Sequence, residues 1–119
     1  MVQPQAEEVA RRVRTLLQDN TAPFRYADVD LLDAINDALD RMASLRPDYF
    51  IDSDFEPARV TALSDTLEMP DRLIYPMTLF VSGFMMLRED EFSTDGRAGA
   101  QLIAAEKLVT EAPGADAQR

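Results

Sequence analysis

The stretch DVDLLDAINDALDRMASL, residues 28–45, carries the strongest helical pattern in the chain. Its apolar residues recur at intervals of three and four positions: Leu31, Leu32, Ile35, Ala38, Leu39, Met42 and Leu45. Such spacing lines one face of an α-helix. Pro47 disfavours the helical conformation at Arg46 and so marks the end of the helix. The pattern predicts an amphipathic helix over residues 28–45.

Aspartates gather on the opposite face of this predicted helix. At about 100° per residue, four of them form one narrow strip, which we call the acidic ridge: Asp30, Asp33, Asp37 and Asp40. A solvated helix face is the ordinary interpretation of such a strip. A functional electrostatic surface is the alternative.

Three further helices are predicted on either side. Residues 5–18 repeat apolar positions at helical spacing. Pro76 suits a first helical position, and residues 77–87 after it are almost wholly apolar, which predicts a helix that is either central or sandwiched between subunits. Ser93-Thr94-Asp95 offers an N-cap for another helix, which ends near Pro113.

Between the second and third predicted helices, residues 59–63 and 66–69 alternate loosely around a polar turn, which predicts a short hairpin. The expected fold class is therefore all-α, a small four-helix bundle with a short β-hairpin between helices two and three. We expect one helical domain over residues 1–111 and a flexible C-terminal tail over residues 112–119. The expected core includes Leu32, Ile35, Leu39, Met42, Phe80, Phe84 and Met85.

Composition narrows the classes of function. The chain of 119 residues carries 12 Lys plus Arg against 22 Asp plus Glu, and the net charge of −10 opposes binding to nucleic-acid phosphates. Histidine and cysteine are absent, which removes disulfides, thiol chemistry and the commonest general base. The longest nearly apolar run, residues 77–87, is far shorter than the roughly 20 residues of a membrane span. We therefore expect no catalytic residues, no cofactor and no membrane partner.

Asp52-Ser53-Asp54-Phe55-Glu56 resembles the opening of a calcium-binding loop. Such a loop needs glycine at its sixth position and glutamate at its twelfth, where this chain has Pro57 and Leu63. We expect no metal site there. An enzyme with an all-carboxylate metal site is a rival hypothesis that calorimetry with magnesium or calcium would test.

The only basic cluster of the sequence is Arg11, Arg12 and Arg14. It lacks interleaved aromatic residues and so makes a poor nucleic-acid patch. Isolated surface arginines are one interpretation of the cluster. The other is a subunit interface, in which the cluster meets three aspartates of a neighbouring copy: Asp33, Asp37 and Asp40. The apolar helix over residues 77–87 favours assembly, because three short helices do not easily cover it.

The run Tyr26–Asp40, followed by Leu45-Arg46-Pro47-Asp48, resembles the second helix of head-tail adaptor (connector) proteins of tailed bacteriophages. In that family an aromatic-x-Asp start leads into Leu-Leu, then Asn and alanine. The run from Met69-Pro70 to Tyr75-Pro76, and the apolar helix that ends at Arg88-Glu89-Asp90-Glu91, resemble the second half of the family pattern. The chain departs from it at Ala27, where such proteins often have a Ser or Thr cap.

The resemblance implies a structural virion protein at the head-tail junction, assembled in the host cytoplasm. In that family roughly twelve copies form a ring beneath the portal vertex, around a channel through which DNA passes without specific binding. The implied partners are copies of the chain, the portal protein and other neck or tail proteins. We expect the segment from Glu111 to Arg119 to dock on the portal, as a terminal segment that orders on binding. The alternative function is an acidic DNA mimic that inhibits a nucleic-acid-binding enzyme.

Overall fold

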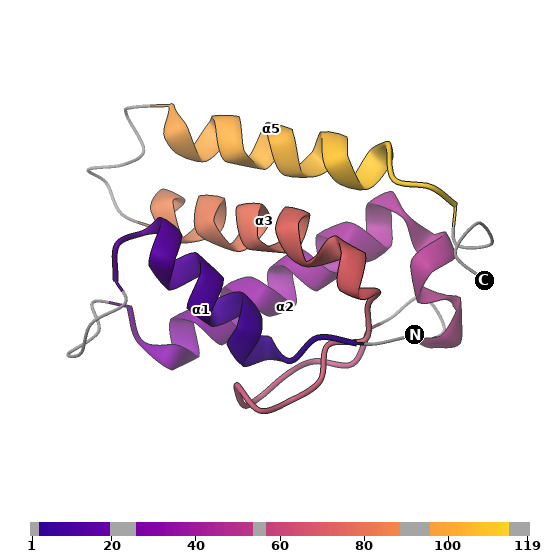
Figure 1. The fold of residues 1–119 in the computed structure, drawn as a ribbon, viewed down its shortest axis with the longest axis horizontal. Helices are drawn as coiled ribbons and strands as arrows, with labels where there is room; N and C mark the ends of the chain where they lie inside the picture. Colours follow the sequence, from indigo (N-terminus) through magenta and orange to yellow (C-terminus); the bar gives the residue numbers. More distant parts are fainter. Residues whose placement is uncertain (1–2, 20–25, 54–56, 89–95, 115–119) are drawn as a thin grey trace.

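The structure, a computed structural model, describes residues 3–19, 26–53, 57–88 and 96–114. Its elements in chain order are α1 (Ala6–Leu16), α2 (Asp28–Leu45), the 3-10 helices η1 (Pro47–Ser53) and η2 (Asp71–Leu73), α3 (Ile74–Leu87) and α5 (Arg97–Thr110). Over these described ranges the chain forms helices and no β-strand, so the fold is all-α. α3 packs against α1, α2 and α5, and α2 passes behind α1 (Figure 1).

The bounds of α2 match the predicted range, whereas those of the other helices differ at their ends. α1 stops at Leu16, and Gln18 takes a left-handed conformation with φ of 58°. Ala27 is the N-cap of α2 and makes no side-chain hydrogen bond there. The predicted cap of the last helix, Ser93-Thr94-Asp95, lies outside the described residues, and α5 begins at Arg97.

The core is centred on α3, whose sequence IYPMTLFVSGFMML is apolar around almost its whole circumference. The helix begins at Ile74, two residues before the predicted start at Pro76. Proline is tolerated at this third helical position because the first backbone N–H groups of a helix have no intrahelical acceptor. Most side chains of α3 are buried, and the large ones that stay exposed are Tyr75 and Leu87.

The chain covers α3 more completely than three short helices would. Non-helical residues contribute to the same core: Val60, Leu67 and Met69 are all buried. Tyr75 and Leu87 of α3 stay exposed, and the expectation that part of the surface of this helix is shared with neighbouring copies stays a prediction. The segment between η1 and η2 supplies the cover that the helical pattern alone did not predict.

The residues expected in the core lie at two depths. Five of them are buried: Ile35, Leu39, Met42, Phe80 and Met85. Leu32 and Phe84 are only partly buried and pack against the edge of the core. The Phe84 ring stacks on Phe80 with centroids 6.0 Å apart, which extends the core toward that edge.

A glycine sets the close approach of α3 and α5, which lie side by side in Figure 1. A Cβ atom at Gly83 would lie 2.8 Å from Cγ of Leu102 and 3.3 Å from the carbonyl oxygen of Ala98. Both separations are shorter than ordinary carbon contacts. Gly83 therefore has a packing role that its place in an apolar run did not indicate.

The predicted β-hairpin is absent from residues 57–70, which the structure describes in full. Their one bridge is to the N-terminal segment, where Gln5 pairs antiparallel with Thr66 and the Leu67 N–H donates to the carbonyl of Pro4 at 2.8 Å. The carboxylate of Asp65 accepts from the N–H groups of Thr61 and Ala62, which lowers the pKa of Asp65. These contacts occupy backbone groups that a hairpin ladder would need.

Asn36 on α2 fixes the same segment from the opposite side. Its side-chain amide donates to the carbonyl of Val60 at 2.9 Å and its oxygen accepts from the Val60 N–H at 2.8 Å. All these groups are buried, so the pair satisfies a backbone residue that no strand partner reaches. The polar Asn36 thus lies on the apolar face of α2 for a structural reason.

Ser82 offers a simple test of packing within α3. Its hydroxyl is fully buried and finds no hydrogen-bond partner among the described residues. An unpaired buried hydroxyl is costly, so Ser82→Ala should raise the free energy of unfolding by about 1 kcal/mol. Urea denaturation measures this. The control is Thr78→Val, which removes a hydroxyl bonded to the Ile74 carbonyl at 2.8 Å and should not stabilise the protein. A Ser82→Ala variant that is less stable than the unmodified protein would show that the Ser82 hydroxyl does have a partner.

Candidate protein interface

Arg14, predicted at a subunit interface, lies inside the protomer. Its side chain is only 9% exposed, and Nη2 donates to the Tyr26 carbonyl at 2.9 Å and to Asp28 Oδ1 at 2.8 Å. Its Nε lies 3.7 Å from the buried carboxylate of Asp19. The prediction was wrong because Arg14 follows the buried Ala10 by one helical turn and so shares its face. Arg14 joins the end of α1 to the start of α2.

Arg11 and Arg12 are exposed, as an interface requires, and both bind Glu8 of the preceding turn. Arg11 Nη2 lies 2.8 Å and Arg12 Nε 3.0 Å from the Glu8 carboxylate. The hydrogen bonds from Arg11 and then Arg12 lower the pKa of Glu8. One carboxylate therefore offsets part of the charge of the two arginines.

The exposed side chain of Tyr75, at the start of α3, lines three adjoining surface depressions. One lies against α1, beside Arg11, Arg12 and Leu16. Another lies toward the end of α5, between Arg72 and Leu108. Neither of these two has an acidic residue among the described residues that line it. The third contains Arg12 and Arg72 together with Glu7, Glu8 and Asp71.

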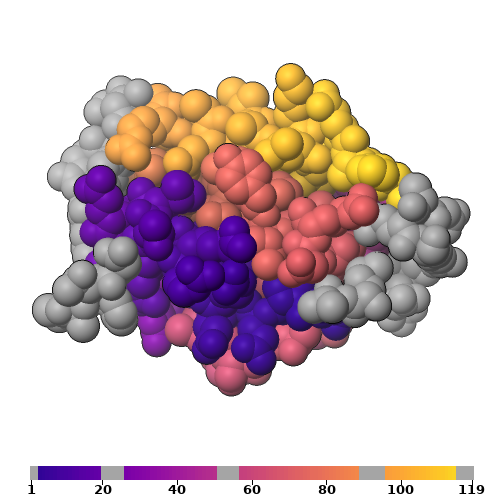
Figure 2. All heavy atoms as spheres, in the orientation of Figure 1, coloured from indigo at the N-terminus to yellow at the C-terminus, as the bar shows by residue number. Residues whose placement is uncertain are grey.

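We call the surface of the first two depressions the Tyr75 face and define it by Arg11, Arg12, Leu16, Arg72, Tyr75 and Leu108. Atoms of α3 reach the surface between α1 and α5 in Figure 2. Arg72 is exposed and forms no ion pair or hydrogen bond with any described residue. The sequence pattern did not indicate Arg72 or Tyr75, because both precede the predicted helix start. Tyr75 is helical because α3 begins at Ile74, and Arg72 lies in η2 just before that helix.

The acidic ridge lies on the exposed side of α2, the helix that passes behind α1 in Figure 1. Asp37 lies 3.7 Å from Arg88 and Asp40 lies 3.4 Å from Arg59, both as exposed pairs. Such surface pairs stabilise by less than about 1 kcal/mol and exchange readily with other partners. Asp33 has no cationic partner in the described part of the chain. The ridge and the Tyr75 face therefore belong to different helices, and the structure does not bring them together within one protomer.

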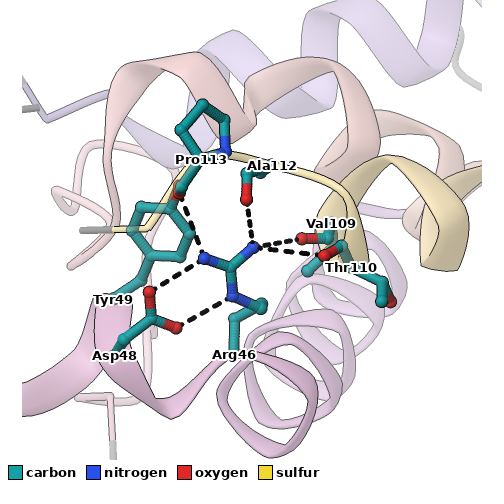
Figure 3. Close-up of polar contacts among 7 residues, drawn as sticks. All are labelled: Arg46, Asp48, Tyr49, Val109, Thr110, Ala112 and Pro113. Carbon is teal, nitrogen blue, oxygen red and sulfur yellow. Dashed lines mark hydrogen bonds and ion pairs between the residues drawn. The ribbon is translucent and has the colours of Figure 1, made fainter. Parts of the chain in front are cut away.

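A second cluster surrounds Arg46, which follows the last residue of α2 (Figure 3). Its guanidinium forms a two-pronged pair with Asp48, with Nε and Nη2 at 2.9 Å and 2.8 Å from the two oxygens. This pairing raises the pKa of Arg46. The same group lies over the Tyr49 ring, 4.7 Å from the centroid. Pairing, stacking and partial burial hold the guanidinium in one orientation.

That orientation points the remaining donors of Arg46 at the end of α5. Nη1 donates to the carbonyls of Val109 at 2.8 Å and Ala112 at 2.6 Å, and Nη2 donates to that of Pro113 at 3.1 Å. The Tyr49 hydroxyl also donates to the Pro113 carbonyl. We call Arg46, Asp48 and Tyr49 the Arg46 clamp. It satisfies carbonyls that the helix end leaves without intrahelical donors.

The Arg46 clamp revises the expected boundary of the tail. Ala112 and Pro113, assigned to a flexible tail over residues 112–119, are held to the body of the protein. Of the two residues predicted to dock on the portal, Glu111 is exposed next to the clamp, and Arg119 lies outside the described residues. Residues 112 and 113 therefore belong to the body of the protein.

The described ranges contain neither a candidate metal centre nor a candidate membrane span. No group of three or more carboxylates is placed there to hold a metal ion. No helix among the described residues has both the length and the hydrophobicity needed to cross a bilayer. No protein-family model, curated protein or solved structure matches the chain.

Proposed function

We propose that the protein is a structural subunit of the head-tail connector of a tailed bacteriophage, which forms a ring between portal and tail around the DNA channel. The proposal includes a four-helix bundle as its protomer, a virion location, and a ring of roughly twelve copies. The runs that resemble the connector family support it, because several of their residues have defined structural tasks. Asn36 holds the segment at Val60, and Arg46 and Asp48 clamp the end of α5.

The observation that carries the proposal is the separation of charge between two surfaces of one protomer. With a net charge of −10, two copies repel each other unless a cationic surface of one meets an acidic surface of the other. Contact of the acidic ridge with itself is disfavoured for the same reason. Head-to-tail contact between unlike surfaces, if it closes, generates a ring.

The charge also suits the lumen of such a ring. DNA that passes through a channel must move without being held, and a wall of the same sign as phosphate prevents adhesion. The residues described above offer carboxylates on α2 for contact with a neighbour and further exposed acidic residues elsewhere. An acidic surplus is therefore compatible with both assembly and passage of DNA.

The test is assembly of the purified chain, alone and with the portal protein of the same phage. Light scattering and electron microscopy should show a ring of many copies, either free or seated on the portal. A chain that stays monomeric in both conditions contradicts the proposal. If that monomer instead displaces DNA from a nucleic-acid-binding enzyme, the acidic DNA mimic is the better explanation. Titration with magnesium or calcium should give no stoichiometric heat, whereas a carboxylate metal enzyme would bind.

A further inference from the structure

The Tyr75 face has the composition of a protein-binding surface. Tyrosine and arginine are among the residue types that most often carry binding energy at interfaces, and tyrosine supplies a large contact area at little cost in conformational entropy. Tyr75 is 58% exposed although it belongs to the helix at the centre of the core. Leu16 and Leu108, on either side of it, are 40% and 41% exposed. The surface is apolar at its centre and has arginines at its edges, and Glu7, Glu8 and Asp71 line the third depression beside it.

The edges are arranged on both sides of the aromatic ring. Arg11 and Arg12 line the depression on the α1 side, and Arg72 lines the one toward α5. The occupant that satisfies both sides is a rod with negative charge along its length. DNA has that charge, but the other carboxylates of this chain repel it.

An acidic helix of a second copy meets the same requirement, and unlike DNA each copy also carries the arginines that meet the ridge of the next copy. On α2, Asp33, Asp37 and Asp40 follow one another at helical spacing, so their carboxylates line one strip. The ridge side of α2 is exposed, and its pairs with Arg88 and Arg59 are weak surface pairs that can be exchanged. Arg72 is the matching cation, because it has no partner among the described residues.

We propose that the Tyr75 face is the socket for the acidic ridge of a neighbouring copy, with Tyr75 as the apolar anchor and Arg72 in place of the internal Arg14. The proposal rests on the proposed function, since it specifies the contact that builds the ring. It assigns one face of the interface to α1 and the start of α3, and the other to α2. Each protomer uses both faces, one toward each neighbour.

Single substitutions test the socket. Arg72→Glu and Tyr75→Ala should each raise the concentration needed for assembly by at least about tenfold, as expected for residues at the centre of an interface. Both side chains are exposed, so thermal unfolding should be unchanged. Matched controls change the same chemistry elsewhere: Lys107→Glu reverses one exposed charge on α5, and Ile103→Ala truncates a side chain that is 71% exposed. Neither control should affect assembly.

A mixing experiment tests the identity of the occupant. A socket variant, Arg72→Glu with Tyr75→Ala, keeps its ridge; a ridge variant, Asp33→Asn with Asp37→Asn, keeps its socket. Each alone should stay monomeric. Their equimolar mixture should form a one-to-one dimer and no ring, because only one competent pair of surfaces remains. Light scattering distinguishes the two outcomes.

The possible failures are distinguishable. If the unmodified chain forms rings and the socket variants form them equally well, the socket is wrong and the connector function stands. If socket variants lose portal binding but still associate with each other, the occupant is a portal segment and this proposal is overturned. An unmodified chain that assembles neither alone nor on the portal overturns both proposals.

Discussion

Replacement of Arg46 by methionine should lower the free energy of unfolding by about 3 kcal/mol, because hydrogen bonds to charged groups contribute roughly 1.5–3 kcal/mol and several are lost together. Methionine keeps much of the aliphatic stem but donates no hydrogen bond. The carbonyls of Val109, Ala112 and Pro113 would then lose their hydrogen bonds from Arg46, and Asp48 would lose its two-pronged pair. Urea denaturation at pH 7 measures the loss.

Arg41→Met is the matched control for this variant. Arg41 also lies on α2 and also binds α5, through Glu106, but this is a single pair between exposed side chains. Its loss should change stability by less than about 1 kcal/mol. The stability of Arg46→Lys should lie between those of the other two variants, because an ammonium group keeps the charge but not the planar set of donors of a guanidinium. Equal stability of the Arg46→Met and Arg41→Met variants would show that the clamp does not hold the end of α5.

Reversal of charge at Arg14 should be at least as damaging, with a loss of about 4 kcal/mol, in the range expected when a buried charge loses its partner. Glutamate at this position would place a carboxylate beside those of Asp19 and Asp28 and beside the Tyr26 carbonyl. Asp19 is only 5% exposed and cannot recover its hydration without local unfolding. Urea denaturation or thermal unfolding reports the change.

Arg12→Glu is the control, two residues away on the same helix. Arg12 is exposed and binds only Glu8 among the described residues, so its reversal should change stability by less than about 1 kcal/mol. If the connector function holds, the Arg12 variant should instead be impaired in assembly. Comparable stability of the two variants would place Arg14 on the surface and return it to the interface predicted from sequence.

The helices were largely predictable, because their signal is local. The α2 pattern sets both its bounds and its two faces, and the apolar run over residues 77–87 correctly indicated a central helix. The absence of the predicted hairpin could not be foreseen from the sequence. Its residues alternate loosely enough to form strands, but Asn36 and the segment at Gln5 bind the backbone groups that the strands would pair.

The candidate interface was predictable only in part. Exposure of Arg11, Arg12 and the acidic ridge follows from helical spacing, which separates one face from the other. Arg72 gave no signal, because an isolated arginine in a turn has no pattern around it. Its place beside Tyr75 follows from the start of α3 and from the packing of α1 against that helix.

The sequence by itself determined the all-α class, the apolar and acidic faces of α2, and the excess of negative charge. The helical class and the two faces of α2 depend on residues within one or two helical turns of each other, and the net charge is a sum over all residues of the chain. The tertiary structure alone decided which arginines are internal. Arg14 and Arg46 have sequence surroundings much like those of Arg12 and Arg41, but each of the first two donates to backbone carbonyls that lie 12 or more residues away along the chain. Whether such a charge is buried depends on what packs against it, and that is set by the fold as a whole.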